Sequence, residues 1–305
     1  MVRKPLRQLY ISACLRIFRM AARWLPMALL IVMLLLPALF KAVVEIFFRK
    51  KSTACFVKLK NGLTDEISPV PLRVIFSIRV RLNLNRMMTF WGEQLRDPKW
   101  RARVEYSGFE HVLEYVDSGR SVLLTSVHYG SPREASTILR SRGLHVSALA
   151  SGNLSPLEQK AVDVRDRLWG LNEVPVVINP LEMWKARDFL NEPGNMLIML
   201  VDRKNNRRDM SGTFLGGQIQ VAKGVVTLAE ITNAVVVPVA CTSIGLLSWR
   251  LWFGEGMEVI DDAGRLRHDD FCQQILGQLS SEMRQFPNQL HPTLIGSMME
   301  NKNNK

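Results

Sequence analysis

The sequence predicts an α/β fold with a mainly parallel central sheet flanked by helices, preceded by an N-terminal membrane-anchor helix. Three observations support this prediction. Short apolar runs rich in β-branched residues alternate with helix-like segments from about residue 120 onward. The helix-like segments start with a cap residue followed by proline, and a long uncharged stretch lies near the N-terminus. Near-continuous apolar strands joined by helices are typical of parallel sheets that are covered on both faces.

The first 60 residues differ in composition from the rest of the chain. They contain twelve Lys or Arg and one acidic residue, whereas the other 245 residues contain 28 basic and 27 acidic ones. Residues 24–40 carry no charge, and after Lys41 a second apolar run continues to Phe48. This length is at the short end for a membrane span, and Lys41 stands where a signal peptide would need small residues. We therefore expect residues 1–60 to be a retained anchor rather than a cleaved signal peptide.

The basic residues around this anchor indicate contact with anionic membrane lipids and not with nucleic acid. Most of the net charge of +12 belongs to this segment, whereas a nucleic-acid-binding domain spreads its basic residues over the folded part. Arginines before the apolar run accompany apolar residues at helical spacing, which is typical of a helix in the lipid headgroup layer. The alternative is that this helix only extends the span. Similar numbers of Lys and Arg on the two sides of the apolar run leave its orientation open.

Residues 61–305 are expected to form one catalytic domain, because no interior linker or repeat interrupts them. Strands are predicted at 121–127, 146–151, 174–178, 195–201 and 235–240. Helices are predicted at 131–143, 155–170 and 179–193, each opened by a cap residue and a proline whose fixed φ suits the first turn. The four cysteines lie far apart without a CxxC pair, which argues against a disulfide framework and a cysteine zinc site.

Two predicted strands end in polar segments, one starting at His128 and the other at Asp202. In parallel sheets ligands bind beyond the carboxyl ends of the strands. A histidine there can act as a general base near neutral pH, and Glu134, six positions later, is the acid expected to hold its tautomer. The alternative is a capping box, in which Ser131 and Glu134 only bond the backbone at the start of the next helix.

Further residues near the two strand ends are candidates for substrate binding. Arginine can hold a phosphate through paired hydrogen bonds, although a short charged run is more often a solvated loop. The candidates are Arg133, Asp202, Arg203, Lys204, Arg207, Arg208 and Lys223. The histidines without an acid at an informative spacing are expected to be structural or on the surface; they are His111, His145, His268 and His291. No third ligand accompanies His128 and Glu134, so no metal site is predicted.

The segment HYGSPRE at 128–134 resembles the His-x4-acid motif of the glycerolipid acyltransferases, which usually reads HFGNWE in the bacterial late lipid A acyltransferases. A second block follows in the family's order: Asp202 after a strand, an aromatic–glycine turn at 214–216, a helix over 223–233 and a strand at 236–239. The resemblance spans roughly residues 20–260, including the anchor with its basic flank. It implies the acyltransferase fold, a lipid A acceptor, a thioester donor on an acyl or aminoacyl carrier protein, and no cofactor.

The chain departs from this family within the motif itself. The acid comes one residue late, Arg133 occupies the usual acid position, and residues 286–299 lack the family's aromatic and basic ending. These departures resemble the divergent branch that transfers glycine to lipid A in polymyxin-resistant bacteria. The resemblance thus implies an aminoacyltransferase of the cell inner membrane, with its catalytic domain on the cytoplasmic side and His128 and Glu134 as the catalytic pair. A fatty acyl donor and a non-catalytic membrane scaffold remain alternatives.

Overall fold

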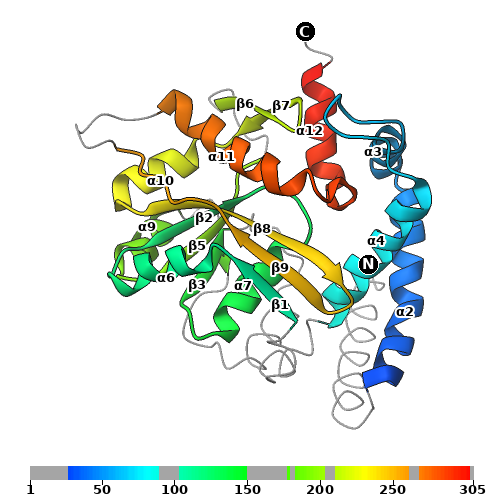
Figure 1. The fold of residues 1–305 in the computed structure, drawn as a ribbon, viewed down its shortest axis with the longest axis horizontal. Helices are drawn as coiled ribbons and strands as arrows, with labels where there is room; N and C mark the ends of the chain where they lie inside the picture. The colour runs from blue at the N-terminus through cyan, green and yellow to red at the C-terminus, as the bar shows by residue number, and fades with distance from the viewer. Residues whose placement is uncertain are drawn as a thin grey trace, which may run out of the picture.

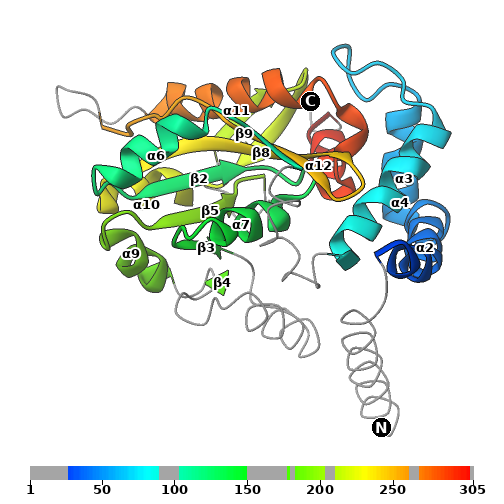
Figure 2. The same ribbon diagram turned by 60° about the horizontal axis from the view of Figure 1, so that its bottom comes forward.

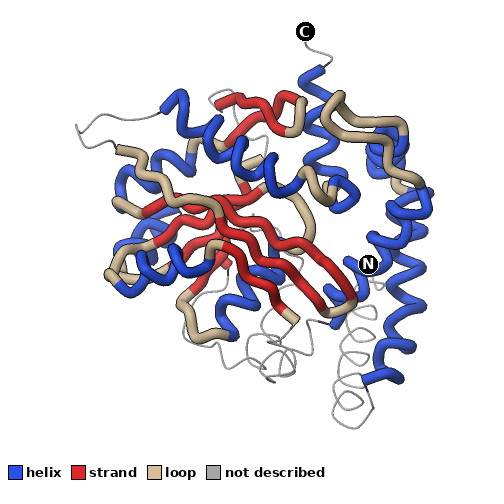
Figure 3. The backbone as a smooth tube through the Cα atoms, viewed as in Figure 1, coloured by secondary structure: helices blue, strands red, loops and turns tan. Residues whose placement is uncertain are grey.

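A computed structural model describes residues 27–88, 103–149, 177–178, 183–202, 210–260 and 268–302. Seven strands of this described part form one sheet in the order β1-β9-β8-β2-β5-β3-β4, and β6 and β7 form a separate antiparallel hairpin (Figures 1 and 3). The strands are β1 (Val104–Ser107), β2 (Val122–Ser126), β3 (Val146–Leu149), β4 (Val177–Ile178), β5 (Met196–Leu200), β6 (Met210–Phe214), β7 (Gly217–Val221), β8 (Val235–Gly245) and β9 (Ser248–Phe253).

The neighbouring strands from β8 to β4 all run parallel to one another. Only the edge beyond β8 is different, because β9 is antiparallel to β8 and β1 pairs in parallel with β9. The described helices are α2 (Met27–Val43), α3 (Lys50–Lys60), α4 (Leu72–Met88), α6 (Phe109–Asp117), α7 (Pro132–Ser141), α9 (Met183–Asn191), α10 (Gly224–Thr232), α11 (His268–Met283) and α12 (Pro292–Lys302). The predicted α/β fold with a mainly parallel sheet is confirmed.

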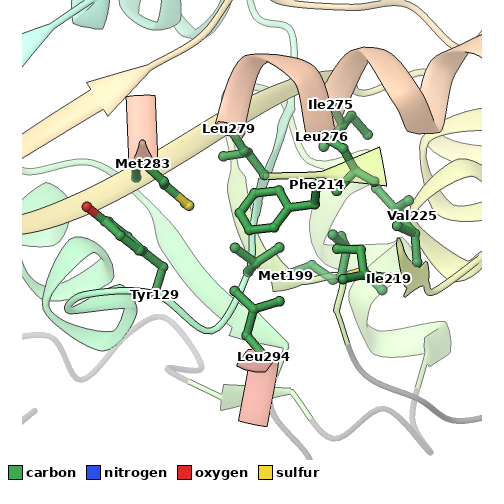
Figure 4. Packing of buried hydrophobic residues seen from close by; sticks show 14 of the residues in the cluster. Tyr129, Met199, Phe214, Ile219, Val225, Ile275, Leu276, Leu279, Met283 and Leu294 are labelled. Atoms are coloured by element: carbon green, nitrogen blue, oxygen red, sulfur yellow. The ribbon is translucent and has the colours of Figure 1, made fainter. Parts of the chain in front are cut away.

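Alternate side chains of the central strands enter two separate cores, one on each face of the sheet. Leu123 belongs to the larger core, to which α9, α10, α11 and α12 contribute; Leu124 belongs to the other, to which α6 and α7 contribute. Helices therefore cover both faces, as Figure 2 also shows. In the larger core Phe214 of β6 lies against Leu276 and Leu279 of α11 (Figure 4). Burial on both faces explains why these strands are apolar throughout.

Most predicted elements appear within a few residues of their expected bounds. The apolar runs at 121–127, 146–151, 195–201 and 235–240 are β2, β3, β5 and β8, and Pro132 occupies the first turn of α7 as expected. Of the strand predicted at 174–178, only residues 177–178 are described, as β4. Of the helix predicted at 179–193, residues 183–191 form α9. The helix predicted at 155–170 lies outside the described residues. The sequence pattern did not indicate α3, α4, α6, α11 or α12, nor the strands β1, β6, β7 and β9.

The N-terminal apolar helix is confirmed, and it packs against the catalytic part through α4. Helix α2 continues into a short π-helical turn, η1 (Val44–Phe48), before α3. Among the described residues, one stretch, Ile31–Phe48, is long and apolar enough to cross a membrane, and only 22% of it is buried within the structure. Its side toward α4 buries Leu34 and Ala38, whereas Leu36, Phe40 and Phe48 are exposed. The boundary at residue 60 stays a prediction.

Candidate active site

The two polar strand ends predicted from the sequence meet at one edge of the sheet. Strands β2 and β5 are parallel neighbours, and Ser126 is aligned with Leu200 in their register. Because His128 and Asp202 each follow two residues after that aligned pair, the register brings them side by side. The Nδ1 atom of His128 lies 2.7 Å from Oδ1 of Asp202. The backbone N–H of His128 donates to the same oxygen at 3.1 Å.

This contact fixes the orientation of the His128 ring. Asp202 is only 1% exposed, and its Oδ1 also accepts the backbone N–H of His128, as a carboxylate oxygen does. Nδ1 must therefore donate, and Nε2 of a neutral His128 carries the lone pair. The His128 side chain is 25% exposed, so that Nε2 can be reached by a substrate while the carboxylate stays buried. A histidine held in this way can accept a proton at Nε2, with the resulting positive charge stabilised by Asp202.

The turn after His128 needs glycine and is bonded on both sides. Gly130 has a φ of +52°, and a Cβ there would collide with the carbonyl oxygen of Cys241 in β8. The backbone N–H of Gly130 donates to Gln289 O at 3.0 Å, and that of Ser131 donates to Cys241 O at 2.9 Å. The loop thus lies between β8 and the segment that precedes α12, which positions His128 at the strand end.

The orienting role expected of Glu134 is filled by Asp202. Glu134 is 6% exposed and lies in the first turn of α7, but no hydrogen bond with His128 occurs among the described residues. The sequence singled out Glu134 because it is close along the chain, whereas the register of β2 and β5 decides which carboxylate reaches the ring. The capping box is not formed. The Ser131 side chain makes no cap bond, and the backbone N–H of Ser131 donates to Cys241 O. Any catalytic role of Glu134 stays a prediction.

The expected substrate-binding residues are only partly described. Arg203, Lys204, Arg207 and Arg208 lie outside the described residues. Arg133 is exposed in the first turn of α7, and Lys223 is exposed at the start of α10. Asp202, which the sequence assigned to this group, contacts His128 instead. In the described part of the chain no group of three or more His, Cys, Asp or Glu side chains could hold a metal ion.

A second histidine, which sequence reasoning treated as structural or surface, lies at the same site. The ring centroids of His291 and His128 are 5.9 Å apart, with an interplanar angle of 37°. The backbone N–H of His291 donates to His128 O at 3.0 Å, beside a β-bridge between Tyr129 and Leu290. Only this long-range contact reveals the residue, since no acid near it along the chain marks it. The sole local signal is the His-Pro-Thr sequence, which is typical of a helix start.

Cationic side chains of α4 and α7 lie close enough to His291 to affect its charge. Although His291 is an exposed residue, the protein around it partly desolvates the imidazole, and Arg79, Arg86 and Arg133 add positive charge nearby. Together with the adjacent His128, these effects lower the pKa of His291, so the ring is neutral at physiological pH.

Helix α4 connects this site with the apolar helix α2. From α4, the Arg81 guanidinium donates to Ser243 O at 2.7 Å, near the end of β8. Gln289 bonds both the N–H and the C=O of Ser243, each at 2.9 Å. Strand β8 runs toward the α2–α4 pair in Figure 1. Helix α4 therefore lies between the carboxyl edge of the sheet and the apolar helix α2, and contacts both.

A parallel sheet with a histidine–aspartate pair at its carboxyl edge is suited to transferring a group onto an activated hydroxyl. A family model described as bacterial lipid A biosynthesis acyltransferase matches residues 81–253, which is more than half of the chain. The chain belongs to this family of transferases, which implies a lipid A acceptor and an acyl donor. A search of curated proteins found no match. The matched region contains His128 and Asp202 but neither α2 nor His291.

Proposed function

We propose that this chain transfers a glycyl group from a carrier-protein thioester to a hydroxyl group of lipid A, with His128 as the general base. The observation that supports this most directly is the 2.7 Å contact between His128 Nδ1 and Asp202 Oδ1, which leaves Nε2 as the proton acceptor. Nε2 takes the proton of the acceptor hydroxyl, whose oxygen attacks the thioester carbonyl. The negative charge of Asp202 stabilises the imidazolium that forms.

The apolar helix gives a lipid acceptor a route to this base. Leu36 and Phe40 of α2 and Phe48 of η1 expose an apolar surface, and such a surface is stable when embedded in a bilayer. We place the protein at the cell inner membrane, with the sheet on the cytoplasmic side where carrier-protein thioesters are found. A lipid A molecule in that bilayer then needs to present only its head group to the edge of the sheet.

The departures within the motif support a small donor group. Arg133 stands at the position that the acid usually occupies in the family, and Glu134 is shifted by one residue, which is about 100° around a helix. Since Asp202 orients His128, Glu134 is not needed for that purpose. A glycyl product adds an ammonium group, which offsets lipid A phosphate charge and weakens the binding of cationic peptides such as polymyxin.

The cationic run at Arg203, Lys204, Arg207 and Arg208 directly follows Asp202 in the sequence. We assign these side chains, with Arg133 and Lys223, to the lipid A phosphates, because guanidinium groups bond phosphates in a paired fashion. This assignment applies to a glycyl donor and a fatty acyl donor alike.

Family membership favours a second candidate, transfer of a fatty acyl chain to lipid A from acyl carrier protein. It also favours either enzyme over a non-catalytic scaffold. The deciding assay incubates the purified full-length protein with lipid A and a carrier protein loaded either with glycine or with a chain of twelve or fourteen carbons. We expect mass spectrometry to show lipid A gaining one or two glycine residues. Transfer of the fatty chain and none of glycine refutes the glycyl proposal, and His128→Ala serves as the inactive control.

A further inference from the structure

His291 belongs to the same edge of the sheet as the proposed base, although it comes from the far end of the chain. Residues 289–291 lie beside residues 128–130 through two backbone hydrogen bonds and the bridge between Tyr129 and Leu290. The two histidine ring centroids are 5.9 Å apart. This separation leaves room for a reacting ester group between the two rings. Such a group could lie within roughly 3 Å of a donor or acceptor atom on each ring.

The hydrogen bonds of His291 determine which nitrogen carries its proton. The residue caps the start of α12, where the backbone N–H of Thr293 donates to Nδ1 at 3.2 Å. Nδ1 is also 3.0 Å from Oγ1 of Thr293. Since Nδ1 accepts a hydrogen bond, the proton of the neutral ring is on Nε2, on the other side of the imidazole. No described residue bonds to Nε2, so this N–H is available to a ligand.

The surroundings of His291 make it a donor and not a second base. Desolvation and the nearby charges of Arg79, His128 and Arg86 lower its pKa, so the ring does not take up a proton at neutral pH. A neutral imidazole N–H can polarise a carbonyl group without giving up its proton, which is the role of the neutral histidine in triosephosphate isomerase. The same cations also favour any negative charge that develops beside the ring.

We propose that His291 is a further catalytic residue, whose Nε2–H donates a hydrogen bond to the carbonyl oxygen of the donor thioester. The inference rests on the proposed function, but it holds for a glycyl and for a fatty acyl donor. A hydroxyl, polarised by His128, forms the new C–O bond while the C=O electron pair moves to oxygen, next to His291. When the carbonyl re-forms, the C–S bond breaks and the leaving thiolate takes the proton that His128 had accepted. His291 keeps its own proton throughout.

Two substitutions at this position separate the catalytic donor from the helix cap. His291→Ser keeps a good N-cap but has no group that reaches the position of Nε2. His291→Gln loses the cap geometry but places an amide N–H near the position of Nε2. We expect kcat of the Ser variant to fall roughly 10²–10³-fold with little change in KM, which is the usual cost of losing one oxyanion donor. The Gln variant should retain most of kcat and unfold at a lower temperature.

The rates are measured as thioester consumption and as transfer to lipid A, using both loaded carriers and the full-length protein. A Ser variant as active as wild type, or a Gln variant as inactive as the Ser variant, overturns the proposal. In addition, ¹⁵N spectra of histidine-labelled wild type should show His291 as neutral Nε2–H between pH 5 and 8. A charged or Nδ1–H ring overturns the proposal without reference to any substrate. If wild type transfers neither donor, the proposed function fails, and the spectrum still decides the state of His291.

Discussion

Asp202→Asn is the most informative change at this site, because it replaces one oxygen with a nitrogen and leaves the shape of the side chain unchanged. The aspartate Oδ1 accepts from both the backbone N–H and the ring Nδ1 of His128, at 3.1 and 2.7 Å. With an amide oxygen at that position, both hydrogen bonds persist but the negative charge is gone. With the amide nitrogen there, two donors face each other, and His128 must move its proton to Nε2 and cease to be a base.

The first orientation is favoured, because the second leaves the buried backbone N–H of His128 without its acceptor. The loss is then that of a charge-assisted hydrogen bond, worth about 1.5–3 kcal/mol, reduced to a neutral one of about 1 kcal/mol. Since the charge matters most once the imidazolium has formed, this difference of about 0.5–2 kcal/mol is a lower limit. At about 1.4 kcal/mol per factor of ten this lower limit is a fall of about 2- to 30-fold in kcat, and with the lost stabilisation of the imidazolium we expect a fall on the order of 10–10²-fold.

The assay compares initial rates of transfer to lipid A for wild type, Asp202→Asn and Glu282→Gln. The last variant makes the same chemical change at a carboxylate of α11 that is buried and bonded by Gln285 and makes no hydrogen bond with His128. Thermal unfolding shows that each variant is folded. In a His128→Ala background, Asp202→Asn should have no further effect, because the two residues act as a unit. An Asn variant as active as wild type refutes the assignment of Asp202 to the base.

Other substitutions test the remaining features. Glu134→Gln should reduce the rate less than Asp202→Asn, because no hydrogen bond joins Glu134 to His128; an equal or larger loss would show a separate role. Gly130→Ala should cost about 1–3 kcal/mol in the free energy of unfolding, measured with denaturant, since φ is +52° and Cβ meets the Cys241 carbonyl. Leu36→Asp with Phe40→Asp should release the protein from membranes in flotation assays, whereas Val57→Asp on α3 should not. Because its pKa is lowered on folding, His291 binds a proton more readily in the unfolded chain; stability should therefore fall as pH drops below about 6.5, and less so in His291→Gln.

The sequence predicts the elements around the site better than the contacts within it. Apolar runs and proline-started helices depend on local rules, so β2, α7, β5 and β8 could be located from the residues alone. The sequence alone could not decide between Asp202 and Glu134 as the partner of His128. Asp202 follows an apolar strand, and Glu134 lies near His128 along the chain. The choice depends on β2 and β5 being neighbours in register, and that is decided by packing of the whole sheet. Proximity in sequence favoured Glu134, whereas the parallel pairing places Asp202 two residues beyond the aligned strand ends.

The same reasoning explains why His291 had no recognisable signal. Its place beside His128 results from Gln289, which bonds to Gly130 and Ser243 and so attaches the start of α12 to the ends of β2 and β8. None of these partners is close to it in sequence. No acidic residue lies close to His291 along the chain, and a general base needs such a neighbour whereas a neutral donor does not. The sequence His-Pro-Thr at a helix start is a weak signal. It indicates that one ring nitrogen of the histidine accepts a hydrogen bond from the first turn of the helix.

The region that matches the family supplies the sheet and the His128–Asp202 pair, but the edge of the site is completed from both ends of the chain. Helix α4 begins before the matched residues and connects the site to the apolar helix α2, and residues 289–291 lie beyond α11, which itself follows the matched residues. In the proposed function His128 and Asp202 act on the acceptor hydroxyl, whichever donor is used. The donor group, by contrast, has to lie against the surfaces that close this edge, among them His291 and the cationic side chains near it. On this proposal we expect a change of donor from a fatty chain to glycine to involve residues in these flanking segments and to leave the His128–Asp202 pair as it is.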